Sequence, residues 1–480
     1  MQVIKNYING KFVSPLSGKY IDNYEPATGK VYSRIPDSDA RDVAHAAEAA
    51  GKTFPLWSSF SAKKRSDILL RIARLIMQHA DALALAETRD NGKPLWLSRK
   101  VDIPRAAANF EFYAHAITQF PSEFHPTDDK AINYTLRDPL GVAGCISPWN
   151  LPLYLFSWKV APALAAGNCV VAKPSELAPM TAFLLSRLCT KAGLPPGALN
   201  IVHGCGATAG AAIVSHPGIT AVSFTGGTKT GAEIARTAAP VFKKLSLEMG
   251  GKNPNIIFAD CNFEQMMETT LRSSFENQGE ICLCSSRIFI EEKIYKKFRD
   301  EFVRRTKRLR TGDPVKKDVA LGALISEEHR NKVLYYIHLA GKEGGKVLTG
   351  GKPVRVNGRC RGGWFVSPAV IEGLPFDCRT NQEEIFGPVV TLTPFKKEEE
   401  ALRYANSTPY GLSATVWTQD ITRAHRVARG LKSGIIWINC WLFRDLRTPF
   451  GGMKQSGVGR EGGFEALRFF TEPKNVCVKL

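Results

Sequence analysis

The stretch CVVAKPSELAPMTAFLLSRLCTKAGLPPGALNIVHGCGATAGAAIVSHPGITAVSFTGGTKTGAEIARTA, residues 169–238, decides the fold. Short apolar runs alternate in it with longer segments of helical periodicity. The expected strands and helices follow one another as Cys169–Ala172, Thr181–Ala192, Leu199–Val202, Ala207–Val214, Ala221–Phe224 and Gly231–Ala238. Such a strand–helix–strand repeat predicts a parallel sheet with right-handed crossovers. We therefore expect an α/β protein with a doubly wound sheet.

A second region of the same kind follows Gly251. Helices are expected near Phe263–Ser274 and Tyr295–Leu309, and apolar strands near Ile256–Phe258 and Ile435–Ile438. A typical domain holds roughly 100–200 residues, so a chain of 480 residues accommodates two such α/β domains.

The segments before residue 169 predict hairpins and then helices. Turn signals at Asn9-Gly10, Ser17-Gly18 and Thr28-Gly29 separate short apolar runs, as in small β-hairpins. A further helix is expected around Pro104–Ile117. One helical face is predicted to carry Ile68, Leu69, Ile72, Leu75 and Ile76.

Two β-prone segments fit neither domain. Lys130–Asp138 alternates like a strand, and Val476–Leu480 is a short tail for which the neighbouring sequence offers no partner. Because an unpaired edge strand tends to pair with another chain, these segments predict an oligomerisation element.

Composition indicates a globular protein of the cytosol, with 44% hydrophobic residues. The segment Met1–Tyr7 lacks the apolar run of a signal peptide, and no stretch reaches the roughly eighteen apolar residues of a membrane span. The eleven cysteines are irregularly spaced and include no Cys-x2-Cys pair, which predicts reduced thiols and neither disulfides nor a zinc site. The histidines are scattered, so we expect no metal.

The formal charge of +19 raises the question of an acidic partner. The densest basic run, Lys293–Arg310, carries Ile294, Phe298, Phe302 and Leu309 at helical spacing. This pattern favours an amphipathic helix with a solvated basic face. No nucleic-acid-binding motif accompanies it, so nucleic acid is not an expected partner.

Two glycine-bearing motifs carry the chemistry: Cys282 ends NQGEIC, residues 277–282, and Glu248 lies in LEMGGK, residues 247–252. A thiolate can add to an electrophilic carbon, and a carboxylate can activate water to hydrolyse the resulting thioester. Both motifs resemble the signatures of the aldehyde dehydrogenase superfamily, and the similarity covers essentially all 480 residues. The resemblance implies oxidation of a small-molecule aldehyde.

The family resemblance also implies a domain division and an oligomeric state. Residues 1–118 and 141–250 would form an NAD-binding domain, and residues 251–452 a catalytic domain. Residues 119–140 and 467–480 would form a small β bridging element. A homodimer or homotetramer is the implied assembly.

Lys173 and Glu176 follow an expected strand, at the sheet edge where α/β folds bind ligands. Both resemble the family pair that holds the adenosine ribose. Since Glu176 would repel a 2′-phosphate, NAD is favoured over NADP.

Two glycine turns are expected to face the cofactor's pyrophosphate. Gly206 and Gly210 follow one strand, but the last glycine comes one residue later than in the common dinucleotide fingerprint. Phe224, Gly226 and Gly227 belong to a second turn, in which the family usually has serine at the position of Gly227. Backbone N–H groups at the helix start could replace the missing hydroxyl.

The remaining cofactor and catalytic assignments follow from the same resemblance. Glu384 and Phe386 lie in EEIFGP and would contact the nicotinamide ribose and ring, with Trp149 also at the cofactor site. Asn150, in SPWNLP, resembles the asparagine that forms the oxyanion hole. Glu280 replaces the usual glutamine two residues before Cys282, and its charge is expected to raise the pKa of that thiol.

Arg105 and Arg444 are the residues that bear on the substrate. An arginine in an aromatic tunnel is costly unless an anion pairs with it, and Trp158 is assigned to the same pocket. The combination resembles the branch of the family that oxidises 2-aminomuconate 6-semialdehyde to 2-aminomuconate, in tryptophan catabolism through kynurenine. The alternative is that the arginines form structural salt bridges with Asp102 or Asp445.

Other activities are less compatible with these residues. A 2-hydroxymuconic semialdehyde is a close alternative substrate. Betaine aldehyde would need an aromatic box without cations, and retinal an apolar tunnel, so Arg444 argues against both. A basic binding protein without catalysis is disfavoured because nucleophile, base and oxyanion donor are all present.

Overall fold

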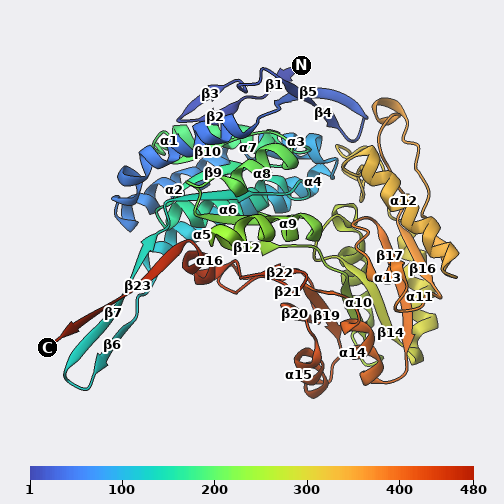
Figure 1. Cartoon of the computed structure of the whole chain (residues 1–480). Coiled ribbons are helices and arrows are strands. Elements are labelled where there is room, and N and C mark those ends of the chain that lie inside the picture. Colours follow the sequence, from blue (N-terminus) through green and yellow to red (C-terminus); the bar gives the residue numbers. More distant parts are fainter.

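In the computed structural model, which describes residues 1–480, the strand–helix repeat of residues 169–238 lies in the middle of an eight-stranded sheet (Figure 1). The strands β12, β11, β8, β9 and β10 are parallel, as predicted. In spatial order the strands are β22 (Gly457–Val458), β12 (Lys244–Glu248), β11 (Ala221–Thr225), β8 (Val142–Ile146), β9 (Cys169–Lys173), β10 (Leu199–Ile201), β2 (Asn6–Ile8) and β3 (Lys11–Val13).

The strand order reverses at β8. The chain runs outward from β8 to β9 and β10, then returns to place β11 and β12 on the other side of β8. In open α/β sheets, ligands bind at the carboxyl ends of the strands that flank such a reversal. This rule places a binding site beyond Ile146 and Thr225, the last residues of β8 and β11.

Helices cover both faces of this sheet. On one face, α1 (Ala40–Ser58) packs against β9 and β10, next to α8 (Ala211–Ser215) and α9 (Thr228–Ala238). The other face is covered by α6 (Pro152–Ala165) and α7 (Met180–Lys191), with α2 (Ala62–Gln78), α3 (Ala80–Asn91) and α5 (Ile103–Thr118) packed outside them. The predicted apolar face of α2 is buried at all five positions. The doubly wound arrangement is therefore confirmed.

The second sheet has seven strands, and its side chains alternate between two cores. Ile257, Ile288 and Ile290 belong to the core on one face of the sheet, whereas Ile256 and Phe289 belong to the core on the other face. The spatial order is β15 (Lys346–Thr349), β16 (Ala369–Glu372), β17 (Val389–Phe395), β14 (Ser285–Glu291), β13 (Asn253–Ile257), β19 (Ser413–Trp417) and β20 (Ile435–Ile438). The covering helices are α10 (Phe263–Phe275), α11 (Glu292–Thr306), α14 (Glu398–Asn406) and α15 (Ile421–Gly430).

A three-stranded β-arm projects from the first sheet (Figure 1). It consists of β6 (Phe124–Thr127), β7 (Ala131–Pro139) and β23 (Thr471–Lys479), with β7 in the centre. The C-terminal tail has no partner in the neighbouring sequence, as expected, but it pairs with a distant segment of its own chain: Val476 lies opposite Tyr134 in an antiparallel ladder. The pairing joins segments far apart in sequence, which local patterns do not register.

The surface elements agree with the predicted hairpins and basic helix. Turns at Asn9-Gly10 and Thr28-Gly29 connect β2 to β3, and β4 (Tyr20–Glu25) to β5 (Lys30–Pro36). On α11, Phe298 and Phe302 are buried and the basic side chains lie outside. None of the helices combines the length and apolar character needed to cross a membrane.

Candidate functional site

A cavity of about 770 Å³ opens at the carboxyl ends of the first sheet's strands, at the reversal of strand order. It is large enough for a substantial part of a dinucleotide. Eight of the predicted cofactor residues line it: Trp149, Lys173, Glu176, Gly206, Gly210, Phe224, Gly226 and Gly227.

Lys173 and Glu176 form the ion pair of this cavity. Lys173 Nζ donates to Glu176 Oε2 at 3.0 Å and to the Gly204 carbonyl at 2.9 Å. The Gly206 N–H donates to Glu176 Oε1 at 3.3 Å. Burial acts to raise the pKa of Glu176, but the Lys173 ammonium and these hydrogen bonds leave that pKa below its ordinary value. Glu176 therefore carries a negative charge at the cavity wall.

The glycines at this wall leave room for a ligand. A Cβ added at Gly206 or Gly227 would meet no atom within 4 Å. Gly227 is the N-cap of α9 and offers no side-chain cap, so the first N–H groups of this helix lack a side-chain partner. Such a helix start binds phosphate groups, which fits the pyrophosphate predicted here. Gly206–Gly210 forms a π-helical turn before α8, in keeping with its unusual glycine spacing.

A second cavity, of about 280 Å³, adjoins the first and contains Trp149, Asn150, Cys282, Glu384 and Phe386. The Gly251 N–H donates to Glu384 Oε1 at 2.9 Å. The rings of Trp149 and Phe386 meet edge to face with centroids 5.4 Å apart.

Two further residues of this second cavity, His329 and Lys332, were missed from the sequence. They lie on α12 (Glu327–Lys342), and His329 Nε2 lies 2.7 Å from the Phe386 carbonyl oxygen. The sequence around these two residues contains no motif that predicts a binding site. Only the packing of α12 against the second cavity brings them there.

A third, narrower cavity reaches Cys282 from the other side. It is lined by Glu248, Cys282 and Arg444, and by the apolar or aromatic residues Leu97, Val101, Leu151, Tyr154, Leu155, Leu442 and Phe450, among others. Cys282 is half-buried and lines both this cavity and the second one. A thiol at the junction of two cavities can contact a molecule bound in either.

Burial is the main influence on the Cys282 thiol and raises its pKa to about 12. The Glu248 and Glu384 carboxylates add to this increase. Glu280 was expected to be the responsible carboxylate, but it is not among the main influences on the Cys282 thiol, and burial raises the pKa of Glu280 itself well above its ordinary value. Its side chain accepts a hydrogen bond from the Ile325 N–H at 3.2 Å, on the inner side of the loop.

Glu248 is buried, and its Oε1 has no hydrogen-bond partner. Burial, and then the nearby Glu461, raise the pKa of Glu248 well above its ordinary value. Glu461 accepts a hydrogen bond from Lys159 Nζ at 2.7 Å. Since no protein group occupies Glu248 Oε1, this oxygen is available to a water molecule, as a general base requires.

Asn150 donates from Nδ2 to the Glu280 carbonyl at 3.0 Å. An amide nitrogen carries two hydrogens, so one remains for another acceptor. Because Glu280 lies two residues before Cys282, this bond attaches the Asn150 side chain to the loop that carries the thiol.

Neither substrate arginine forms the predicted alternative salt bridge. Asp102 pairs with Lys93 at 2.6 Å and Asp445 with Arg447 at 2.6 Å. Arg444 Nη1 instead donates to the Tyr154 hydroxyl at 2.9 Å. The alternative is wrong because closer cations occupy both carboxylates.

Arg105 and Trp158 lie behind the cavity lining rather than in it, which corrects their expected placement in the substrate pocket. The Arg105 guanidinium lies over the Tyr154 ring at 5.3 Å, and its Nη2 has no partner. Trp158 is buried beneath both guanidinium groups, 5.7 Å from Arg105 and 5.2 Å from Arg444.

Comparison with known protein families matches residues 12–476 to the aldehyde dehydrogenase family. The chain belongs to the aldehyde dehydrogenase family. It is 52% identical to 2-aminomuconic semialdehyde dehydrogenase of Danio rerio, over 99% of this chain and 98% of that protein. It is 46% identical to 2-hydroxymuconic semialdehyde dehydrogenase of Pseudomonas sp. (strain CF600), with both chains covered completely.

Solved structures agree with this membership. An aldehyde dehydrogenase from Bacillus cereus, solved as an NAD+ complex, is 39% identical and superposes with a TM-score of 0.97. The alignment covers 100% of this chain and 97% of that one. The predicted aldehyde dehydrogenase fold is therefore confirmed.

Proposed function

We propose that this aldehyde dehydrogenase oxidises 2-aminomuconate 6-semialdehyde to 2-aminomuconate with NAD. The choice of an anionic substrate is supported by one observation. Arg444 lines the same cavity as Cys282 and forms no ion pair with a carboxylate. The semialdehyde of a dicarboxylic acid keeps one carboxylate, which would supply the missing anion. Relatives from Danio rerio and Homo sapiens, 52% and 48% identical, bear the name of this activity.

The residues suggest a division of roles. Cys282 attacks the aldehyde carbon, while Asn150 Nδ2 and the Cys282 backbone N–H stabilise the oxyanion. Lys173, Glu176 and the helix start after Gly227 would hold NAD, which would supply the hydride acceptor. Glu248 then removes a proton from the water that hydrolyses the thioester.

The cofactor assignment rests on the first cavity. The ionised Glu176 offers acceptors for ribose hydroxyls and opposes a 2′-phosphate. The uncapped start of α9 offers N–H groups to a pyrophosphate. Both features favour NAD over NADP.

A 2-hydroxymuconic semialdehyde remains the second candidate, because a relative with that activity in its name is 46% identical. It carries the same carboxylate, so the arginines would serve both substrates. Betaine aldehyde and retinal lack an anion for Arg444.

A panel of anionic, neutral and cationic aldehydes, scored by NADH formation, tests the proposal. We expect muconic semialdehydes to have the highest kcat/KM and betaine aldehyde the lowest. Equal efficiency for anionic and neutral aldehydes would remove the basis of the substrate assignment. No NADH from any aldehyde would favour a binding protein.

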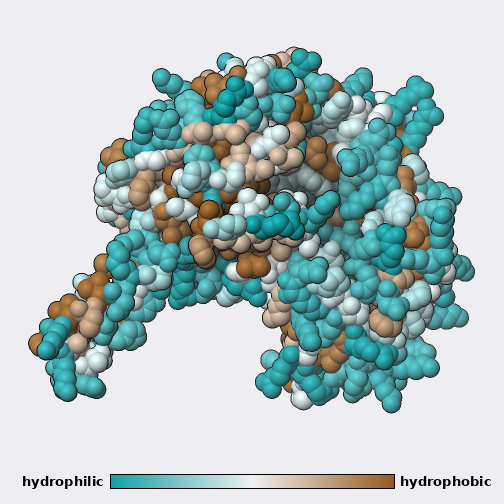
Figure 2. Space-filling model, viewed as in Figure 1, coloured by the Kyte–Doolittle hydropathy of each residue, from teal (hydrophilic) through white to brown (hydrophobic).

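We further propose that the protein is a cytosolic homodimer or homotetramer assembled through the β-arm. Hydrophobic atoms are visible along the arm (Figure 2), and Phe124, Leu136, Val478 and Leu480 are its exposed apolar residues. All eleven cysteines are free thiols, as in a reducing compartment. Deleting residues 476–480 should shift the mass measured by light scattering toward the monomer, and an unchanged mass would contradict this assembly.

A further inference from the structure

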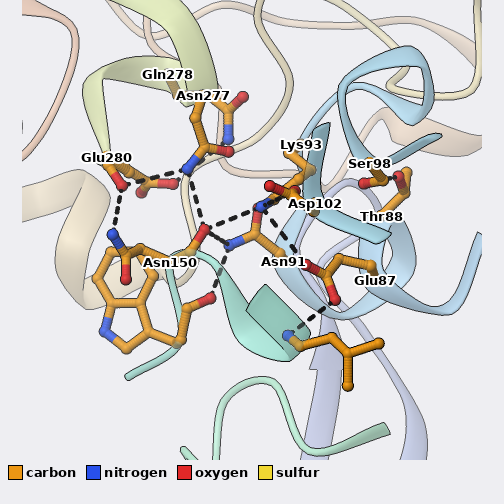
Figure 3. Close-up of polar contacts among 12 residues, drawn as sticks. Glu87, Thr88, Asn91, Lys93, Ser98, Asp102, Asn150, Asn277, Gln278 and Glu280 are labelled. Carbon is orange, nitrogen blue, oxygen red and sulfur yellow. Dashed lines mark hydrogen bonds and ion pairs between the residues drawn. The ribbon is translucent and has the colours of Figure 1, made fainter. Parts of the chain in front are cut away.

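Lys93 is a fully buried lysine in a polar cluster that includes Asn150 (Figure 3). Its Nζ lies 2.6 Å from Asp102 Oδ2 and 3.8 Å from Glu87 Oε1. It also donates to the backbone carbonyl of Asn150 at 3.0 Å. Burying these charges is costly. Asp102 also lines the narrow cavity beside Cys282, whereas Lys93 lines none of the three cavities.

The Asn150 carbonyl accepts three side-chain donors. Besides Lys93 at 3.0 Å, Asn277 Nδ2 donates at 3.1 Å and Asn91 Nδ2 lies at 3.5 Å. Asn91 Nδ2 also donates to the Trp149 carbonyl at 2.9 Å. The peptide groups on both sides of the Asn150 Cα are therefore held by side chains, which fixes the direction of its own side chain.

The same cluster reaches the loop that carries the nucleophile. Asn277 Nδ2 donates to the Glu280 carbonyl at 3.2 Å, the oxygen that also accepts from Asn150 Nδ2. Asn277 and Gln278 have left-handed backbones, with φ of 52° and 56°. Such strain persists only where the surroundings enforce it, and Gln278 is held by the Ala323 carbonyl and the Gly322 N–H.

The two carboxylates differ in their relation to Lys93. Burial, partly opposed by the Lys93 charge, raises the pKa of Glu87 to about 8. Asp102 is the closer of the two carboxyl groups, at 2.6 Å from Lys93 Nζ against 3.8 Å for Glu87. Glu87 Oε2 accepts from the Leu153 N–H at 3.2 Å, three residues after Asn150.

We propose that Lys93, neutralised by Asp102, is the positioning residue for the oxyanion donor: it fixes the Asn150 carbonyl and thereby aims Asn150 Nδ2 at the aldehyde oxygen. The inference rests on the aldehyde-oxidising function and not on the substrate preference. It assigns a part in acylation to a side chain that touches neither substrate nor cofactor.

The test compares acylation in Lys93→Met/Asp102→Asn with the unaltered enzyme, both carrying NAD, by stopped-flow NADH formation from benzaldehyde. The paired change avoids leaving Asp102 as an unpaired buried charge. Loss of one oxyanion donor costs about 10²–10³ in rate, so its misdirection should slow acylation roughly 10- to 100-fold. The KM for benzaldehyde and the affinity for NAD should change less than about threefold. The reason is that a misdirected Asn150 amide weakens stabilisation of the transition state and not binding of the ground state.

The decisive experiment introduces the paired change into a protein that already carries Asn150→Ala. If Lys93 acts through Asn150, then Lys93→Met/Asp102→Asn should slow acylation less than about threefold further in Asn150→Ala, since coupled residues are not additive. A full additional loss would show that the cluster acts elsewhere and would overturn the proposal. So would a normal acylation rate in the folded paired variant.

Two controls separate positioning from folding. Thr88→Val alters a buried residue of α3 that bonds only to Ser98 within the cluster, at 3.0 Å, and should acylate normally. Lys93→Gln/Asp102→Asn, whose glutamine is too short to reach the Asn150 carbonyl, should reproduce the loss with a polar side chain in place of methionine. If both Lys93 variants fail to fold while Thr88→Val folds, Lys93 is a stability residue and the proposal is wrong. If the unaltered enzyme oxidises no aldehyde, the proposed function fails first.

Discussion

Arg444 donates a hydrogen bond to the hydroxyl of Tyr154 at 2.9 Å and has no carboxylate partner. Its guanidinium also lies over the ring of Phe450, 4.0 Å from the centroid. Aromatic faces and one hydroxyl stabilise a cation less completely than a carboxylate does. The cavity beside Cys282 therefore retains an unsatisfied positive charge.

Replacing Arg444 by Gln should weaken turnover of a muconic semialdehyde and spare benzaldehyde. A charge-assisted hydrogen bond contributes about 1.5–3 kcal/mol, so kcat/KM should fall roughly ten- to a hundred-fold. Arg105→Gln should have the same selectivity, with a smaller loss because Arg105 lies behind the lining. Steady-state NADH formation with both aldehydes measures this.

Arg447→Gln is the matched control, because Arg447 lies in the same loop but is exposed and pairs with Asp445. It should leave both substrates unaffected. If Arg444→Gln reduces both substrates equally, the arginine is structural.

Local patterns were sufficient for most elements of the fold. β20 spans Ile435–Ile438, as predicted, because a short isolated apolar run is typical of a sheet strand. The helix expected at Tyr295–Leu309 instead spans Glu292–Thr306. It begins directly after β14, with no turn residues to mark the boundary, and the periodicity alone does not fix its ends.

The site was predictable only where function is carried by contiguous motifs. Cys282 and Glu248 lie in such motifs, whereas Lys93, Tyr154 and His329 come from segments distant in sequence. Their burial and hydrogen bonds arise when α3, α6 and α12 pack around the loops of both sheets. The sequence around Lys93 contains no pattern that predicts a contact between its ammonium group and Asn150.

Cys282→Ala should abolish NADH formation, whereas Glu248→Gln should allow one turnover and then stall. The reason is that the thiol is needed for the thioester and the carboxylate for its hydrolysis. Glu248→Gln should give a burst of about one NADH per subunit and an acyl group on Cys282 visible by mass spectrometry. Cys284→Ala, at a buried thiol two residues away, should retain turnover. Acylation found on Cys284 would refute Cys282 as nucleophile.

Alkylation of Cys282 by iodoacetamide in the cofactor-free enzyme should accelerate steadily with pH. Burial raises the pKa of this thiol to about 12, and only the thiolate reacts. Since the measured range lies below that pKa, the rate constant should rise about tenfold per pH unit between roughly pH 7 and 9.5. A plateau near pH 8 would mean that the free enzyme stabilises the thiolate. Peptide mapping distinguishes Cys282 from the exposed Cys477.

Glu176→Gln should narrow the preference for NAD over NADP. In the unaltered protein the ionised Glu176 lies at the cavity wall, held by Lys173 at 3.0 Å and by the Gly206 N–H. A like charge brought close to it costs at least about 1.4 kcal/mol, which is tenfold in affinity. The amide retains an acceptor for a ribose hydroxyl and removes the repulsion, so kcat/KM for NADP should rise roughly tenfold while that for NAD falls. Glu233→Gln, at another carboxylate lining the same cavity, should change the ratio much less. Equal efficiencies with both cofactors in the unaltered enzyme would show that Glu176 does not face the ribose.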